Sequence, residues 1–201
     1  MVSGITKDAM YEIINFIVKS IDLIEDYSKE NMINLLITAR KENKRVFVIG
    51  AGRSGLIARA FAMRLLHLGF NVYVIGETIL PRASPGDILI AISGSGRTKL
   101  VVAAAEAAKG ALMKVVAITT YPDSPLGRMA DIVVRIPGRT KMAIEEDYIS
   151  RQILGIHEPL APLGTLFEDT TLIFLDGIIV ELMNRLGVTE EELMNRHANI
   201  E

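Results

Sequence analysis

Five short runs of apolar residues, each of strand length, dominate the middle of the chain and set its fold class. Between them lie longer stretches with the apolar spacing of helices, such as 54–68 and 98–109. Runs that are apolar at every position are typical of strands buried on both faces, and helix-length crossovers join such strands in parallel. The sequence therefore predicts an α/β fold with three α/β/α layers and a five-stranded parallel sheet. The predicted strands are Val46–Ile49, Val72–Ile75, Ile88–Ile92, Val115–Thr119 and Ile132–Ile136.

Extra helices are expected on both sides of this core, within one domain. A chain of 201 residues is of single-domain size. Apolar spacing predicts two N-terminal helices, which would form a packing or oligomer-forming arm, and further helices over 165–186 and 189–195. We therefore expect a single domain, 1–201, with four parts. These are the helical arm (1–42), the sheet core (44–136), a long loop (137–164) and the C-terminal helices and tail (165–201).

The charge and the cysteine content exclude several classes of function. The chain has no cysteine, three histidines and a formal net charge of −2. Thiolate metal sites, a cysteine nucleophile and a disulfide framework are thereby excluded, and no overall positive field would attract nucleic acid or a membrane. The first residues lack the pattern of a signal peptide, and no apolar segment reaches the ~20 residues of a membrane span. We expect a cytoplasmic protein whose hydrophobic residues, half of the total, partly face other subunits.

The first predicted strand runs into a glycine-rich loop, Gly50-Ala-Gly52-Arg53-Ser54-Gly55. This G-x-G-x-x-G spelling, followed by Glu77 after the second strand, fits a dinucleotide fingerprint. It also fits any tight turn between a strand and a packed helix. Gly52, Arg53, Ser54 and Glu77 are therefore candidate ligand-binding residues, with either a nucleotide or a sugar phosphate as the ligand.

A second loop, Ser93-Gly-Ser95-Gly-Arg97-Thr98, follows the third strand and precedes a helix. Its hydroxyls, its glycines and an arginine at a helix N-terminus supply donors for one compact dianion. The Gly-Lys-Ser/Thr of a Walker loop is missing. Ser93, Ser95, Arg97 and Thr98 are therefore predicted to bind the phosphate of a small substrate.

Several segments together resemble the sugar isomerase (SIS) domain family. They are both glycine-rich loops, Thr119–Leu126 and Ala130-Asp131. In addition, residues 74–77, 162–168 and 196–201 make the whole chain similar to the 6-phospho-3-hexuloisomerases. This resemblance implies a flavodoxin-like SIS fold, a homotetramer, and no cofactor. It also implies conversion of arabino-3-hexulose 6-phosphate to fructose 6-phosphate, a step of the ribulose monophosphate pathway.

Moving a carbonyl from C3 to C2 requires a base that removes the C2 proton and returns a proton to C3. Glu168 is the candidate, because it follows a Pro-Leu-Gly turn at the start of an apolar helix and is expected to face a half-buried cleft. The enediolate oxygen needs a donor. His197, in the terminal segment that is similar to the family, is the candidate for that role, in its own or a neighbouring subunit. His67 is expected to be structural, while His157 in the long loop stays an alternative.

Three other functions remain open at this point. One is an NAD-dependent oxidoreductase that uses Gly50–Gly55 and Glu77. The second is a non-catalytic sugar-phosphate sensor, and the third is another aldose–ketose isomerase, with a substrate such as arabinose 5-phosphate. The acidic run at 145–147 lacks a complementary ligand cluster, so we expect it to be solvated and we expect no metal.

Overall fold

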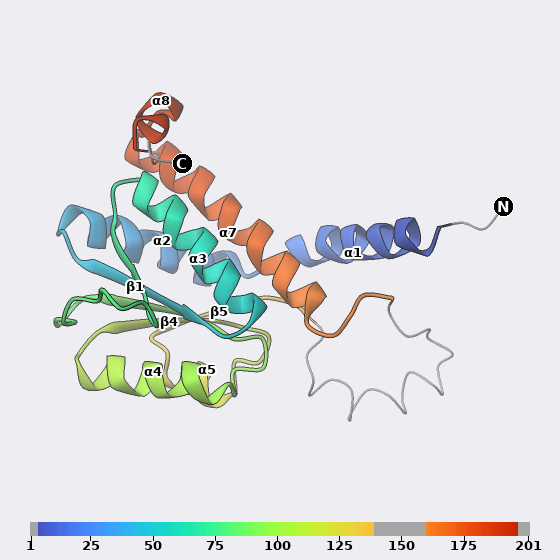
Figure 1. Cartoon of the computed structure of the whole chain (residues 1–201), viewed down its shortest axis with the longest axis horizontal. Helices are drawn as coiled ribbons and strands as arrows, with labels where there is room; N and C mark the ends of the chain where they lie inside the picture. The colour runs from blue at the N-terminus through green and yellow to red at the C-terminus, as the bar shows by residue number, and fades with distance from the viewer. Residues whose placement is uncertain (1–3, 139–159, 197–201) are drawn as a thin grey trace.

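A parallel sheet of five strands forms the centre of the molecule (Figure 1). The computed structural model describes residues 4–138 and 160–196. The strands lie in the order β2-β1-β3-β4-β5, and each neighbouring pair is parallel. This is the flavodoxin-like order, which confirms the predicted fold class and places a topological switch point between β1 and β3. The strands are β1 (Arg45–Gly50), β2 (Asn71–Val74), β3 (Ile88–Ile92), β4 (Lys114–Thr119) and β5 (Ile132–Arg135).

Helices cover both faces of the sheet (Figure 1). α2, α3 and α7 pack on one face, and α4 and α5 pack on the other. α1 extends beyond this body, and α8 follows the end of α7. The helices are α1 (Ile5–Ile21), α2 (Asp26–Lys41), α3 (Arg53–His67), α4 (Lys99–Gly110), α5 (Pro125–Met129), α7 (Thr165–Leu186) and α8 (Glu190–Met194).

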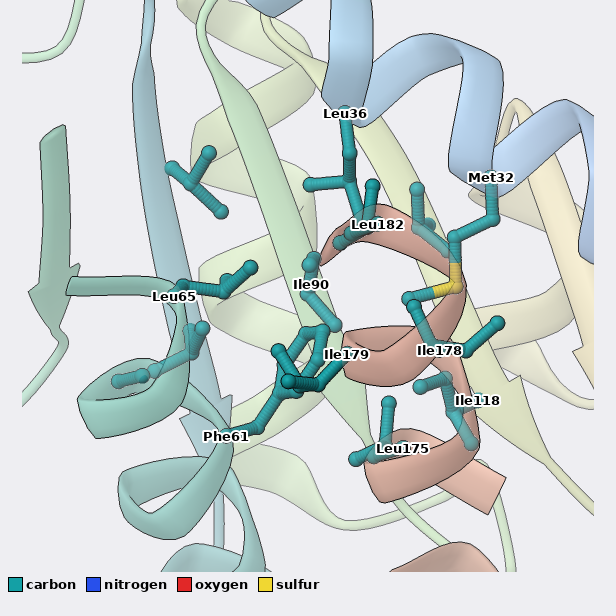
Figure 2. Packing of buried hydrophobic residues seen from close by; sticks show 14 of the residues in the cluster. Met32, Leu36, Phe61, Leu65, Ile90, Ile118, Leu175, Ile178, Ile179 and Leu182 are labelled. Carbon is teal, nitrogen blue, oxygen red and sulfur yellow. The ribbon is translucent and has the colours of Figure 1, made fainter. Parts of the chain in front are cut away.

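The central strand β3 explains why its sequence is apolar at every position. All five of its residues are completely buried. Ile88, Ile90 and Ile92 face the cluster formed with α2, α3 and α7, which Figure 2 shows around Ile90 and Ile118. Leu89 and Ala91 face the opposite cluster, formed with α4 and α5. Each large side chain removed from water in this way contributes roughly 1.5–3 kcal/mol.

One short helix was absent from the sequence prediction. α5 occupies five residues between β4 and β5. Ser124 caps it by accepting a hydrogen bond from the Gly127 amide, and Pro125 stands at its first position. A serine followed by proline is a normal start for a helix. The helix was missed because five residues are too few to show an apolar period.

Candidate active site

The two glycine-rich loops lie side by side at the carboxyl edge of the sheet. β1 and β3 are neighbours, and their register pairs Gly50 with Ile92. Each strand therefore ends at the same level, and the residues that follow emerge together. In sheets of this kind, ligands bind outside the carboxyl ends of the strands at the switch point. The predicted binding residues of the two loops are thus brought to the position where a ligand is expected.

The glycines of the first loop are required by its backbone. A side-chain carbon on Gly50 would lie 2.5 Å from the Ser54 carbonyl oxygen, and one on Gly55 would lie 2.9 Å from the Gly50 carbonyl oxygen. These two glycines allow β1 to pass directly into α3. Gly52 has a φ of 58°, which favours glycine although space is available around it. The G-x-G-x-x-G spelling is therefore explained by packing, without any nucleotide.

The second loop presents hydroxyl groups at the start of α4. The Ser93 side chain is buried, and its Oγ lies 3.0 Å from Thr98 Oγ1. Ser95 is half-buried and its Oγ accepts a hydrogen bond from the Arg97 amide at 3.3 Å, while the Arg97 side chain is exposed. Among the described residues, no side chain caps α4. Its first amide groups, which have no partner within the helix, are therefore suited to an anion.

The segment after β4 holds this loop in place. The Gly94 carbonyl accepts hydrogen bonds from Thr119 Oγ1 at 3.2 Å and from the Thr120 amide at 3.1 Å. Gly96 lies so close to this segment that a side-chain carbon there would be 1.9 Å from Ser124 Oγ. The loop is therefore preorganised, which lowers the entropy cost of binding an anion.

Glu168 lies in the first turn of α7, which packs along α3. The helix begins after Gly164, whose φ is 95°, and the Glu168 amide donates to the Gly164 carbonyl at 3.0 Å. The Glu168 side chain is only 15% exposed. Its Oε2 lies 2.8 Å from Arg53 Nε, in an ion pair that lacks the alignment of a hydrogen bond.

Arg53 connects the first loop to α7 through three side chains. Besides Glu168, its guanidinium contacts Asp169 Oδ1 at 3.1 Å and Thr165 Oγ1 at 3.5 Å. Asp169 and Thr165 were missed by the sequence reasoning. The signal for Asp169 was its place beside Glu168 in an acidic helix start, whereas nothing in the sequence indicated the contact with Thr165.

Burial is the main influence on the Glu168 carboxyl, and it raises the pKa of Glu168 above its usual range. The Arg53 guanidinium opposes this shift, and the negative charge of Asp169 adds to it. A carboxylate held in this way is a stronger base than one in water, because its charged form is poorly solvated. The group is thus suited to accept a proton from carbon.

The other predicted residues are placed differently. Glu77 follows β2 and forms an ion pair with Arg59 on α3, so the described contacts do not join it to the two loops. Ser54 is buried in the first turn of α3. His67 is buried at the other end of α3. His197 and His157 lie outside the described residues.

Residues 4–138 and 160–196 hold neither a cluster of metal ligands nor a membrane-spanning helix. No group of three or more histidine, cysteine, aspartate or glutamate side chains lies close enough there to hold a metal ion. Within the same residues, none of the helices is both long and apolar enough to span a membrane.

Comparison with known proteins identifies the family. The SIS domain matches residues 40–148. A 3-hexulose-6-phosphate isomerase from Bacillus subtilis is 36% identical over 196 residues, which cover 98% of this chain and 99% of that protein. The enzyme of the same name from Mycobacterium gastri is 46% identical over 157 residues, 78% of this chain and 74% of that protein.

A solved structure agrees with this relationship. A Methanococcus jannaschii protein, for which the molecular function of 3-hexulose-6-phosphate isomerase has been inferred, superposes with a TM-score of 0.73. It is 35% identical, and the match covers 96% of this chain and 97% of that one. The chain therefore belongs to the SIS domain family, in which its relatives include 3-hexulose-6-phosphate isomerases.

Proposed function

We propose that this protein is a phosphosugar isomerase that converts arabino-3-hexulose 6-phosphate to fructose 6-phosphate in the cytoplasm. The observation that carries the proposal is the half-buried Glu168 carboxylate on α7, which Arg53 ties to the first of two adjacent loops at the switch point. The relatives named 3-hexulose-6-phosphate isomerase support the choice of substrate.

The phosphate of the substrate binds to the second loop. Ser93, Ser95 and Thr98 supply hydroxyl donors, the start of α4 supplies amide groups, and Arg97 supplies positive charge. Gly52, Ser54 and the backbone around them shape the adjoining wall. Because this end of the substrate does not react, its binding energy serves to position the carbons near Glu168.

Glu168 then moves the proton. Its carboxylate removes the proton from C2, the C2–C3 bond becomes the double bond of an enediolate, and negative charge develops on the C3 oxygen. The hydroxyl proton of the C2 oxygen moves to the C3 oxygen, and the same carboxyl group returns a proton to C3, which leaves the carbonyl at C2 and a hydroxyl at C3. Oε2 is buried and lies 2.8 Å from Arg53 Nε, so in this proposal the carboxyl group exchanges the substrate proton through its other oxygen, Oε1. The steps consume no redox equivalent, and we propose that no cofactor is used.

His197 from a neighbouring subunit donates to the developing oxyanion. Arg196 donates a hydrogen bond to the His67 carbonyl at 3.1 Å, at the C-terminal end of α3. Arg53 stands at the opposite end of this helix of 15 residues, which spans about 21 Å. This placement of Arg196 favours a role for His197 in the site of another subunit over a role in its own.

A homotetramer would supply that neighbouring subunit. α1 extends beyond the body of the molecule (Figure 1), and large apolar side chains along it are exposed. Exposed apolar surface of this kind usually marks an interface. The exposed residues are Ile5, Met10, Tyr11, Ile14, Val18 and Ile21.

A panel of phosphosugars, assayed without added metal or nucleotide, tests the proposed reaction. Fructose 6-phosphate should form from the 3-hexulose phosphate faster than from any aldose phosphate. Turnover of arabinose 5-phosphate alone would instead support the aldose–ketose alternative. Glu77 stays a candidate for substrate binding in this proposal, and in the described structure it is paired with Arg59.

A further inference from the structure

The N-terminal helix reaches the segment that leads into α7. Glu12, on α1, accepts a hydrogen bond from the Leu160 amide through Oε2 at 3.1 Å. Its other oxygen, Oε1, accepts from the Ala161 amide at 3.2 Å. One carboxylate therefore holds two successive backbone amides that are distant from it in the sequence. Hydrogen bonds to a charged acceptor are stronger than those between neutral groups, so this contact is a firm link between α1 and residues 160–161.

The link is partly buried: Leu160 is exposed, whereas the bond to Ala161 is sheltered. Ala161 is 4% exposed, and Glu12 is half-buried. A buried backbone amide needs a hydrogen-bond partner. Removing the Glu12 carboxylate would leave the Ala161 amide without the partner that it has in the structure.

Backbone hydrogen bonds connect the segment that Glu12 binds to Glu168. The Thr165 amide donates to the Pro162 carbonyl at 3.1 Å, which closes a turn directly after Ala161. Gly164 follows with its φ of 95°, and its carbonyl accepts from the Glu168 amide at 3.0 Å. The turn that Glu12 holds is thus the turn that sets where α7 begins and where its first-turn side chains lie.

We propose that Glu12 is a positioning residue of the active site, which holds the 160–164 turn so that α7 presents Glu168 to the two loops. This inference rests on the proposed role of Glu168 as the base. Arg53, on α3, contacts the first turn of α7. Glu12, on α1, binds the segment that precedes α7. Accordingly, α1 is part of the catalytic scaffold as well as an arm.

Variants at position 12 test the proposal. Glu12→Ala removes both acceptors, whereas Glu12→Gln keeps the shape and one acceptor oxygen. Asn15→Ala, an exposed position on the same helix, is the matched control. A displacement of about 1 Å at a reacting group costs about 10²-fold in rate. We expect Glu12→Ala to lower kcat at least tenfold with KM within twofold, Glu12→Gln to fall between it and wild type, and Asn15→Ala to match wild type.

Two further measurements separate positioning from general damage. In a Glu168→Gln background, Glu12→Ala should lower the residual rate by less than twofold, because the group that it positions is already missing. Sedimentation should show an unchanged assembly state. A kcat within twofold of wild type for Glu12→Ala would overturn the proposal, as would an undiminished loss in the Glu168→Gln background or a loss explained by dissociation.

Amide hydrogen exchange tests the link without reference to activity. Exchange at Leu160 and Ala161 and in the first turn of α7 should accelerate in Glu12→Ala and not in Asn15→Ala. Unchanged exchange would refute the Glu12 link itself. If exchange accelerates but Glu168→Gln keeps full turnover, the proposed role of Glu168 has failed, and with it the catalytic part of the Glu12 proposal.

Discussion

Arg53 Nε lies 2.8 Å from Glu168 Oε2 and so joins the first residue of α3 to the first turn of α7. The contact brings a residue of the first glycine-rich loop to the candidate base. It also sets the electrostatics of that base, because the guanidinium favours the carboxylate form that burial disfavours. In the proposed mechanism, the activity of the site depends on the balance between these two influences.

The acidic limb of the pH profile of kcat/KM should report this balance. Glu168 must be deprotonated to act, and burial raises its pKa, so activity should be lost on acidification at a higher pH than for an ordinary glutamate. Asp169→Asn removes a charge that raises this pKa and should move the limb to lower pH. Arg53→Gln removes the charge that lowers it and should move the limb to higher pH.

The control for these two variants is Asp176→Asn, which makes the same charge change at an exposed position two turns along α7. Its profile should match that of wild type. Shifts of Asp169→Asn and Arg53→Gln in the same direction would show that another group controls the limb.

The second loop should determine the affinity for the phosphate end of the substrate. Ser95→Ala combined with Thr98→Ala should raise KM about 10²-fold or more, because two donors to a dianion are lost, each worth about 1.5–3 kcal/mol when the partner is charged. Inorganic phosphate should compete with substrate in wild type and compete more weakly in the variant. Thr38→Ala, exposed on α2, is the control. An unchanged KM in the double variant would assign the phosphate to another part of the site.

Calorimetry with NAD(H) and NADP(H) distinguishes the isomerase from the oxidoreductase. Gly50 and Gly55 are accounted for by the contact between β1 and α3, and Glu77 is paired with Arg59. We therefore expect no binding tighter than the millimolar range. Micromolar affinity for either dinucleotide would favour the oxidoreductase function.

The sequence was sufficient for the sheet because its signal is local. β3 is buried on both faces, and five consecutive apolar residues record that directly. The two loops were found for the same reason, since each follows its strand. In contrast, the contact of Arg53 with Asp169 depends on how α7 packs along α3, and the contact of Glu12 with residues 160–161 joins segments that are 148 residues apart. Neither contact produces a periodic pattern in the sequence from which it could be predicted.

Glu77 illustrates the converse case. Its position after the second strand fits the fingerprint of a dinucleotide site. In the described structure it forms an ion pair with Arg59, an exposed residue of α3. The motif predicts a ligand contact for Glu77 and did not indicate this ion pair. The spacing of residues in a motif does not determine the conformation of the loop that brings Glu77 to Arg59.

The central claim is that Glu168 catalyses isomerisation by moving a proton, and turnover of arabino-3-hexulose 6-phosphate in heavy water tests it most directly. Wild type should form fructose 6-phosphate with solvent deuterium on the carbons next to the carbonyl. Glu168→Gln, which keeps the size of the side chain but cannot accept the proton, should lower kcat by at least about 10²-fold and incorporate no deuterium. Near-normal turnover by a folded, assembled Glu168→Gln variant, or a wild-type product without deuterium, would contradict the account.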